Sequence, residues 1–292
     1  MKKIIIATLF ASLAVACAPQ LPAEHESFSA DTSIINGTPV KERKTRAAQS
    51  VVLIEALDSR NRIIGLCSGT LISTHALLTA AHCLDRGLMP SLRTFNLVFT
   101  EEYSPGKALV RRAGTRFFLH PRYNSTGTHD HDIAVGFFAG EIPSRYYWVR
   151  FDSDQRADYS GKTVYVYGYG RTQDWRENEP PSLAIGRLHR GVMKIDNNYS
   201  RQADRYRTSS ESRSYICSGD SGGPQFHHEQ GVLKIIGINS ATIVTRKGSK
   251  TCIGLAQATK VANASEWIKK ILKTYSPAIT RSATQQPERS IW

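Results

Sequence analysis

The sequence of 292 residues lacks the patterns that identify a cofactor-dependent protein. It has no histidine, cysteine or carboxylate spacing typical of a metal site, no glycine-rich phosphate loop and no cofactor motif. It has no internal repeat and no low-complexity block, so no repeat architecture is indicated. With 40% hydrophobic and 22% charged residues it is not a largely disordered chain. We expect a globular protein with no metal and no cofactor.

The chain also lacks a long cationic run, although it is basic. Its 38 Lys and Arg residues against 25 Asp and Glu residues give a formal net charge of +13. Nucleic-acid-binding proteins gather their cations in a patch or stripe, whereas these are scattered. We therefore expect no nucleic-acid partner. The charge instead favours attraction to an anionic cell surface.

No hydrophobic stretch at the N-terminus is long enough to span a bilayer as a helix. Lys2 and Lys3 precede an apolar stretch over residues 4–16, and Cys17 follows. This pattern predicts a signal peptide over residues 1–16, of a bacterial exported protein. Either Cys17 is lipidated and becomes the new N-terminus, or it is removed with the signal peptide. The first alternative predicts an outer-membrane or cell-surface lipoprotein.

Cysteine is scarce and its count is odd, which bears on that choice. An exported chain with an odd number of cysteines leaves one without a disulfide partner. Lipidation of Cys17 would leave four, enough for two disulfides in an oxidising compartment. We therefore favour the lipoprotein. The five cysteines are Cys17, Cys67, Cys83, Cys217 and Cys252.

The rest of the chain divides into three parts by composition. Residues 17–33 are polar with two prolines, which predicts a linker or propeptide. Residues 34–272 contain short runs rich in Val, Ile, Tyr and Thr, separated by Gly, Pro, Asn or Ser, which predicts an all-β domain. Helical spacing is clear only at about residues 263–272. Residues 273–292 are expected to form a loose C-terminal tail.

Three segments carry side chains that suggest chemistry. His82 ends the run Leu-Thr-Ala-Ala-His, and Asp132 begins the run Asp-Ile-Ala-Val. Alone, the first fits an ordinary imidazole and the second a strand end. Ser221 lies in Gly-Asp-Ser-Gly-Gly, which is more specific. Glycines on both sides of a serine allow a tight turn that points two N–H groups at one spot, as an oxyanion hole requires.

Together these segments resemble the trypsin-like (chymotrypsin-fold) serine peptidases. The order His, Asp, Ser is that of this family and differs from those of subtilisins and α/β-hydrolases. Ile-Ile-Asn-Gly at residues 34–37 resembles the family's mature N-terminus. Residues 120–124 and 168–172 resemble the segment before the aspartate and a Gly-aromatic-Gly strand end. The resemblance implies two six-stranded antiparallel β-barrels, divided near residues 150–160, with the active site between them and a C-terminal helix.

The resemblance assigns a role to each residue of the predicted site. It implies a catalytic triad of His82, Asp132 and Ser221, with the N–H groups of Gly219 and Ser221 forming the oxyanion hole. Asp130 is a rival to Asp132 that does not fit the family motif. The remaining cysteines match two family disulfides. These are Cys67–Cys83 and Cys217–Cys252.

The resemblance also implies activation by proteolysis. Cleavage before Ile34 would create an ammonium group that pairs with Asp220. The residue before the cut is Ser33, where Lys or Arg is usual. A different activating protease is therefore expected among the partners, besides protein or peptide substrates. If Cys17 carries a lipid, the same cut would release the protease from its anchor into a secreted form.

The predicted specificity pocket contains Tyr215, Ser240 and Ala256. Trypsins have an aspartate at the position of Tyr215, and the stretch 232–258 contains no acidic residue. Burying an arginine there without a partner would be costly, so we expect a preference other than Lys or Arg. Tyr215 either shortens the pocket for small apolar side chains or helps basic residues accept an acidic one. The basic candidates are Arg246, Lys247 and Lys250.

Two other functions remain compatible with these residues. The first is a surface lipoprotein that uses the fold only to bind another protein. The second is catalysis directed at esters or at one dedicated partner protein. The complete set of His82, Asp132 and Ser221 favours an endopeptidase over the binding protein.

Overall fold

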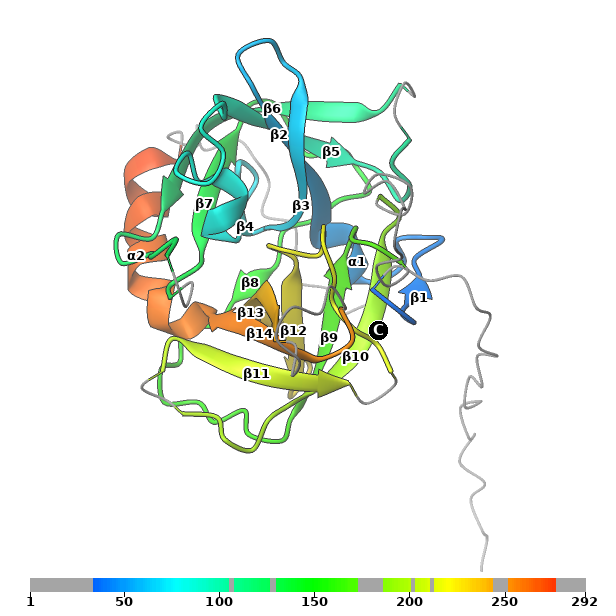
Figure 1. Cartoon of the computed structure of the whole chain (residues 1–292), viewed down its shortest axis with the longest axis vertical. Coiled ribbons are helices and arrows are strands. Elements are labelled where there is room, and N and C mark those ends of the chain that lie inside the picture. Colours follow the sequence, from blue (N-terminus) through cyan, green and yellow to red (C-terminus); the bar gives the residue numbers. More distant parts are fainter. Residues whose placement is uncertain are drawn as a thin grey trace, which may run out of the picture.

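The computed structural model describes residues 34–104, 108–126, 130–172, 186–200, 203–210, 213–243 and 252–276. These residues form two β-barrels, one above the other in Figure 1, with a helix at the C-terminal end of the described chain. The expected all-β fold with two six-stranded antiparallel barrels is confirmed. Within the described ranges, no helix combines the length and apolar character needed to cross a membrane.

The first barrel is a closed antiparallel sheet in the order β2-β3-β4-β7-β6-β5. Every residue of β2, β4 and β7 is buried, because these strands face the barrel interior on one side and neighbouring segments on the other. The strands are β2 (Val51–Leu57), β3 (Ile63–Leu71), β4 (Ala76–Thr79), β5 (Thr94–Phe99), β6 (Val110–Leu119) and β7 (Ala134–Phe138).

The second barrel closes in the order β9-β10-β11-β14-β13-β12 and back to β9. Burial alternates along β10, as expected for a strand with one face in a core. The strands are β9 (Thr163–Gly168), β10 (His189–Ile195), β11 (Arg205–Ser210), β12 (Pro224–Glu229), β13 (Val232–Ile243) and β14 (Leu255–Lys260). The short strands β1 (Thr38–Pro39) and β8 (Arg150–Phe151) pair with β10 and β13.

A buried arginine joins the two barrels. The Arg43 guanidinium donates hydrogen bonds to the carbonyls of Val51 and Thr100 in the first barrel, at 2.9 and 2.5 Å. It also donates to the hydroxyl of Tyr169, which follows β9 of the second barrel, at 2.5 Å. Glu101 lies 3.2 Å from the same guanidinium and supplies an opposite charge. Removing one partner of such a buried charge is strongly destabilising, so the barrels are held in a defined arrangement.

Three helices complete the described chain. α1 (Arg46–Ser50) and the 3-10 helix η1 (Ala81–Leu84) are short, and α2 (Val261–Tyr275) is longer. α2 extends beyond the expected 263–272, so residues 273–275 belong to the helix and not to a loose tail. The last turn is held because the Tyr275 ring stacks on Phe118 of the first barrel, with centroids 4.4 Å apart.

Candidate active site

His82 and Asp132 are brought together by two neighbouring antiparallel strands. β4 pairs with β7 so that Thr79 lies opposite Ala134. His82 follows the end of β4 and Asp132 precedes the start of β7, which places both at the same edge of the sheet. His82 Nδ1 lies 2.7 Å from Asp132 Oδ2, and the His82 backbone N–H donates to Asp132 Oδ1 at 2.9 Å. The rival Asp130 instead pairs with Arg205, at 2.8 Å.

Asp132 is fully buried yet held in its charged form. Burial alone would raise the pKa of this carboxyl, but hydrogen bonds from the His82 ring and Ser240 hold it below its ordinary value. The charge of a protonated His82 acts in the same direction. Asp132 therefore presents a carboxylate that fixes the imidazole with Nδ1–H toward it and leaves Nε2 available as a base.

Ser240 was expected to line the specificity pocket, and the structure shows a further contact. Its hydroxyl donates to Asp132 Oδ2 at 2.6 Å. The cause is a break in the β13–β14 register between Asn239 and Ala241, which leaves Ser240 as an extra residue. A bulge re-aims the side chain that it contains. Ser240 therefore acts on the His82–Asp132 pair from the second barrel, a role that no local sequence pattern indicated.

The loop carrying Ser221 depends on glycine. Gly219 and Gly222 have φ of 98° and 79°, in the left-handed region that side chains disfavour. A Cβ at Gly222 would collide with the Thr79 side chain and the Ser68 carbonyl. In the parts of the chain that the structure describes, the N–H groups of Gly219 and Ser221 have no protein acceptor. Two N–H groups of one tight turn that have no protein acceptor are the kind of donors that stabilise an oxyanion.

Residues of both barrels form hydrogen bonds with the backbone of the loop that carries Ser221. Ser68 of β3 donates its N–H to the Ser221 carbonyl at 2.8 Å and its hydroxyl to the Gly219 carbonyl at 2.8 Å. From the second barrel, the Asn239 carbonyl accepts the Gly222 N–H at 2.8 Å. The sequence gave no indication of the role of Ser68, because the groups it binds are backbone carbonyls that every residue carries.

Asp220 is also fully buried, but in a different environment. Its carboxylate accepts the N–H groups of Gly170 and Cys217, both at 2.8 Å. Burial raises the pKa of Asp220 to about 7, and these two hydrogen bonds offset only part of that cost. Gly168 and Gly170 border the carboxyl so closely that a Cβ at either position would collide with it.

The predicted new N-terminus lies beside the serine loop in the uncut chain. The Ile34 side chain is buried in the core of the second barrel, in space left by the missing Cβ of Gly191. Ile35 forms two backbone hydrogen bonds with Tyr215, of 2.9 and 3.0 Å. The segment that begins at Ile34 is therefore joined directly to the segment that leads to Asp220 and Ser221.

The other two expected pocket residues, Tyr215 and Ala256, lie in the second barrel and beside its disulfide. Tyr215 is partly buried and packs against Cys217–Cys252. Ala256 is buried and lies opposite Thr242 across β13 and β14. The Thr242 hydroxyl donates to the Ile216 carbonyl at 3.1 Å, which joins β13 to the segment that contains Tyr215. Arg246, Lys247 and Lys250 lie outside the described residues, as does Cys17.

The first disulfide, Cys67–Cys83, lies next to His82. Both disulfides are the pairs that the resemblance implies. The sulfur atoms of Cys67 and Cys83 and a ring nitrogen of His82 lie within 4.8 Å of one another. This cluster is not suited to a metal, because metal-ligating cysteines are thiolates and these sulfurs are bonded to each other.

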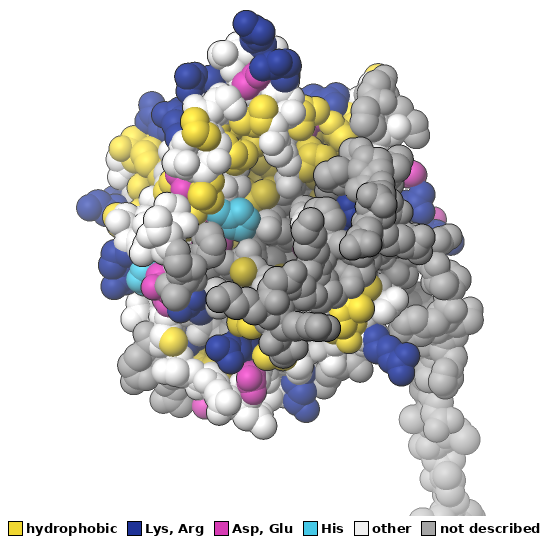
Figure 2. All heavy atoms as spheres, viewed as in Figure 1, with side chains coloured by type: hydrophobic (Ala, Val, Ile, Leu, Met, Phe, Trp, Pro, Cys, Tyr) yellow, Lys and Arg dark blue, Asp and Glu magenta, His cyan; other side chains and the backbone are white. Residues whose placement is uncertain are grey.

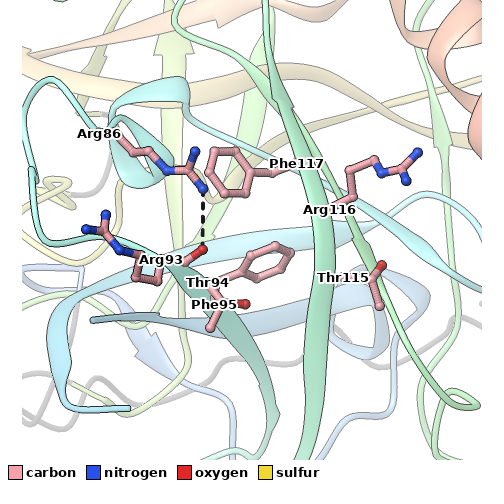
Figure 3. Close-up of a pocket in the computed structure, with 7 residues that line it drawn as sticks. All are labelled: Arg86, Arg93, Thr94, Phe95, Thr115, Arg116 and Phe117. Atoms are coloured by element: carbon pink, nitrogen blue, oxygen red, sulfur yellow. Dashed lines mark hydrogen bonds between the residues drawn. The ribbon is translucent and has the colours of Figure 1, made fainter. Parts of the chain in front are cut away.

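Among the described residues on the face shown in Figure 2, Lys and Arg side chains are spread around the rim. A pocket of the first barrel, drawn in Figure 3, is lined by Arg86, Arg93, Arg116 and neighbouring residues. The Arg86 guanidinium lies 5.3 Å from the centre of the Phe117 ring, whereas those of Arg93 and Arg116 point away from it. This pocket contains none of the predicted site residues.

The sequence of this chain is similar to those of several known proteins. Serine protease SP24D of Anopheles gambiae is 28% identical over 214 residues, which cover 72% of this chain and 73% of that protein. The fibrinolytic enzyme, isozyme C, of Lumbricus rubellus is 24% identical over 204 residues, covering 64% and 79%. Kallikrein-11 of Homo sapiens is 27% identical over 230 residues, covering 75% of each chain. These relatives are animal proteins and lend no support to a bacterial origin.

The profile of the trypsin family matches residues 34–268, which include both barrels and most of α2. This range contains every residue of the candidate active site described above. The chain therefore belongs to the trypsin family of serine proteases.

Proposed function

We propose that this protein is a serine endopeptidase that hydrolyses peptide bonds through an acyl-enzyme, with Ser221 as nucleophile. His82 is the general base, and Asp132 orients it. The observation that carries the proposal is the 2.7 Å contact between His82 and a buried, ionised Asp132. It is supported by the neighbouring loop, which offers Ser221 and two N–H groups without protein acceptors among the described residues.

The reaction follows from these roles. Ser221 Oγ attacks the scissile carbonyl carbon while its proton passes to His82 Nε2. The N–H groups of Gly219 and Ser221 stabilise the resulting oxyanion, each by roughly 3 kcal/mol. The amine leaves with the proton from His82, and water then repeats the sequence to release the acid and restore Ser221.

The protein is made as a zymogen in this proposal. A cut before Ile34 creates an ammonium group in the segment already joined to Tyr215. Asp220 suits this partner, because a buried carboxyl with a raised pKa is stabilised in its charged form by an adjacent cation. The ion pair would fix the loop between Cys217 and Ser221, and with it the oxyanion hole.

The preferred residue before the scissile bond is small and apolar. The Thr242–Ile216 contact joins the walls of the pocket, and Tyr215 replaces the aspartate that binds Lys or Arg in trypsins. Exchange of Thr242 for glycine should open the pocket. The rate of cleavage of a peptide with Phe at this position, relative to one with Ala, should then rise. A peptide library tests the alternative, which is a preference for an acidic residue.

Residues 1–33 provide export and attachment in this proposal. Lipidated Cys17 would hold the zymogen at a bacterial outer membrane or cell surface, and the cut before Ile34 would activate and release it in one event. Mass spectrometry of the membrane fraction checks for the lipid on Cys17. A membrane-retained form that is fully active would contradict the coupling of activation to release.

The central test uses the chain from Cys17 onward, before and after a cut at Ile34. Each form is treated with a fluorophosphonate probe, and the adduct is located by mass spectrometry. Labelling of Ser221 only after the cut supports a zymogen serine hydrolase, and Ser221→Ala is the control. Absence of labelling in both forms would favour the protein-binding alternative, and labelling without peptide cleavage would favour an ester or one dedicated substrate.

A further inference from the structure

The residue immediately before Asp132 has an unusual backbone. His131 has φ of 52°, in the left-handed region that residues with a Cβ rarely adopt. Such a conformation is strained and persists only where the surrounding structure holds it. Because φ and ψ of His131 set the direction in which the chain enters Asp132, whatever holds His131 also aims that carboxylate.

The group that holds the His131 backbone belongs to the second barrel. The His131 backbone N–H donates to Asp204 Oδ2 at 2.5 Å, and His131 Nδ1 lies 3.7 Å from the same oxygen. Asp204 lies directly before β11 of the second barrel. Its own carbonyl accepts the Lys260 N–H at 2.7 Å, which fixes Asp204 to the junction of β14 and α2. A hydrogen bond to a carboxylate is about twice as strong as one between neutral groups.

A second contact between the barrels lies next to the one between Asp204 and His131. Arg205 Nη2 lies 2.8 Å from Asp130 Oδ1, so consecutive residues of one barrel bind consecutive residues of the other. Arg205 Nη1 donates to Gln257 of β14 at 3.4 Å, which ties this contact to the same barrel. We call the four residues Asp130, His131, Asp204 and Arg205 the inter-barrel clasp.

The ring of His131 is packed as well. It stacks on His120 with centroids 4.8 Å apart, and His120 meets the edge of Trp267 on α2 at 5.0 Å. Burial, together with the charges of His131 and Arg122 and against the opposing effect of Asp204, lowers the pKa of His120 to about 4. The pKa of His131 is also lowered by burial, although Asp204 and Asp130 oppose this. Two uncharged rings can stack at neutral pH without repulsion.

We propose that Asp204 is a positioning residue, whose carboxylate holds the left-handed backbone of His131 and thereby fixes Asp132 against His82. This inference rests on the proposed function for its effect on rate, but its geometry does not depend on catalysis. Ser240 also reaches Asp132 from the second barrel. The second barrel thus orients a carboxylate that the first barrel carries, so the pair with His82 depends on the alignment of the two barrels.

The test compares variants of the cut enzyme on one peptide substrate. Asp204→Ala should lower kcat by about tenfold and leave KM nearly unchanged, because only the alignment of catalytic groups is lost. Asp204→Asn keeps an acceptor oxygen and should retain most of kcat. His131→Gly in the Asp204→Ala background should restore part of kcat, since glycine adopts positive φ without strain. Asp196→Ala removes a carboxylate of the same barrel that is not part of the clasp, and is the matched control.

A second readout does not require activity. In ¹⁵N-labelled Ser221→Ala protein, the proton on His82 Nδ1 should give a far-downfield NMR signal that Asp204→Ala shifts upfield or broadens. If the wild type neither hydrolyses peptides nor reacts with the probe, the proposed function fails while this signal still tests the clasp. Wild-type kcat and an unchanged signal in Asp204→Ala would overturn the inference, as would an equal loss in Asp196→Ala. Asp204→Ser serves where the alanine variant does not fold.

Discussion

Two fully buried aspartates of this protein, Asp132 and Asp220, have opposite environments. Asp132 accepts a side-chain hydrogen bond from His82 and another from Ser240, and its pKa is held low. Asp220 accepts only backbone N–H groups among the described residues, and its pKa rises to about 7. Asp132 therefore has side-chain partners that favour its charge, whereas no described side chain donates a hydrogen bond to the carboxyl of Asp220.

In the function proposed above, Asp132 serves catalysis and Asp220 serves its control. Burial disfavours the charge on both carboxyls, and only the partners differ. The partners of Asp132 are permanent side chains of the two barrels. A cation for Asp220 would come from cleavage before Ile34, in the proposal made above. Changes that exchange or remove these partners should therefore affect the two sites in different ways.

The largest effect is expected from Asp132→Asn. Asp132 Oδ2 accepts from the His82 ring and Ser240, and Oδ1 accepts from the His82 backbone N–H. An amide has only one acceptor oxygen. When that oxygen takes the backbone N–H, the NH₂ group faces the imidazole and favours the wrong tautomer. We expect kcat of the cut enzyme to fall by roughly 10⁴-fold. Steady-state kinetics on a peptide substrate checks this, with the exposed Asp154→Asn as control. Retention of more than a tenth of wild-type kcat would contradict the assigned role.

The next effect is a pH dependence of the uncut chain. Asp220 has a folded pKa of about 7 against an ordinary value of 3.8, so the unfolded chain loses this proton first as the pH rises. Its contribution to the free energy of unfolding is fully present below about pH 4 and is lost as the pH approaches 7, by at most about 4 kcal/mol.

Urea unfolding of Ser221→Ala with and without Asp220→Asn isolates this contribution, because other titrating groups cancel in the difference. Cleavage before Ile34 should abolish or reverse the trend. An uncut chain whose difference from Asp220→Asn is the same at pH 4 and pH 7 would show that Asp220 already has a compensating partner.

The two disulfides extend the comparison of Asp132 with Asp220, because one disulfide lies beside each aspartate. Cys217–Cys252 closes 35 residues and Cys67–Cys83 closes 16. Restriction of the unfolded chain predicts losses of about 4 and about 3 kcal/mol when each pair is replaced by serine. Thermal unfolding of Ser221→Ala carrying each replacement measures the order. Removal of Cys217–Cys252 should also slow probe labelling in the active background, because that bridge holds the segment before Ser221.

The smallest effect is expected from Ser240→Ala. It removes one of the side-chain hydrogen bonds to Asp132 and leaves His82 in contact. Hydrogen bonds to charged groups contribute about 1.5–3 kcal/mol, so kcat should fall by roughly 10- to 100-fold. Kinetics of the cut enzyme checks this, with Ser240→Thr as the conservative variant that keeps a hydroxyl. No loss in Ser240→Ala would mean that His82 alone orients Asp132.

Much of the fold and part of the site followed from the sequence. Short β-rich runs predicted the all-β class, and the resemblance carried by His82, Asp132 and the glycines around Ser221 implied two barrels and both disulfides. Boundaries were less accurate at α2, where the contact of Tyr275 with Phe118 extends the helix. The sequence could not reveal that contact, because the two residues are distant along the chain.

The sequence by itself determined which groups carry the chemistry, because glycine, cysteine, serine and histidine each permit reactions or backbone shapes that few other residues permit. The tertiary structure alone decided what orients them. Ser240 reaches Asp132 across 108 positions, Asp204 reaches His131 across 73, and Ser68 reaches Gly219 across 151. Two of these contacts end on backbone groups, which every residue possesses. The sequence therefore cannot indicate them, and only the packing of the two barrels brings the partners together.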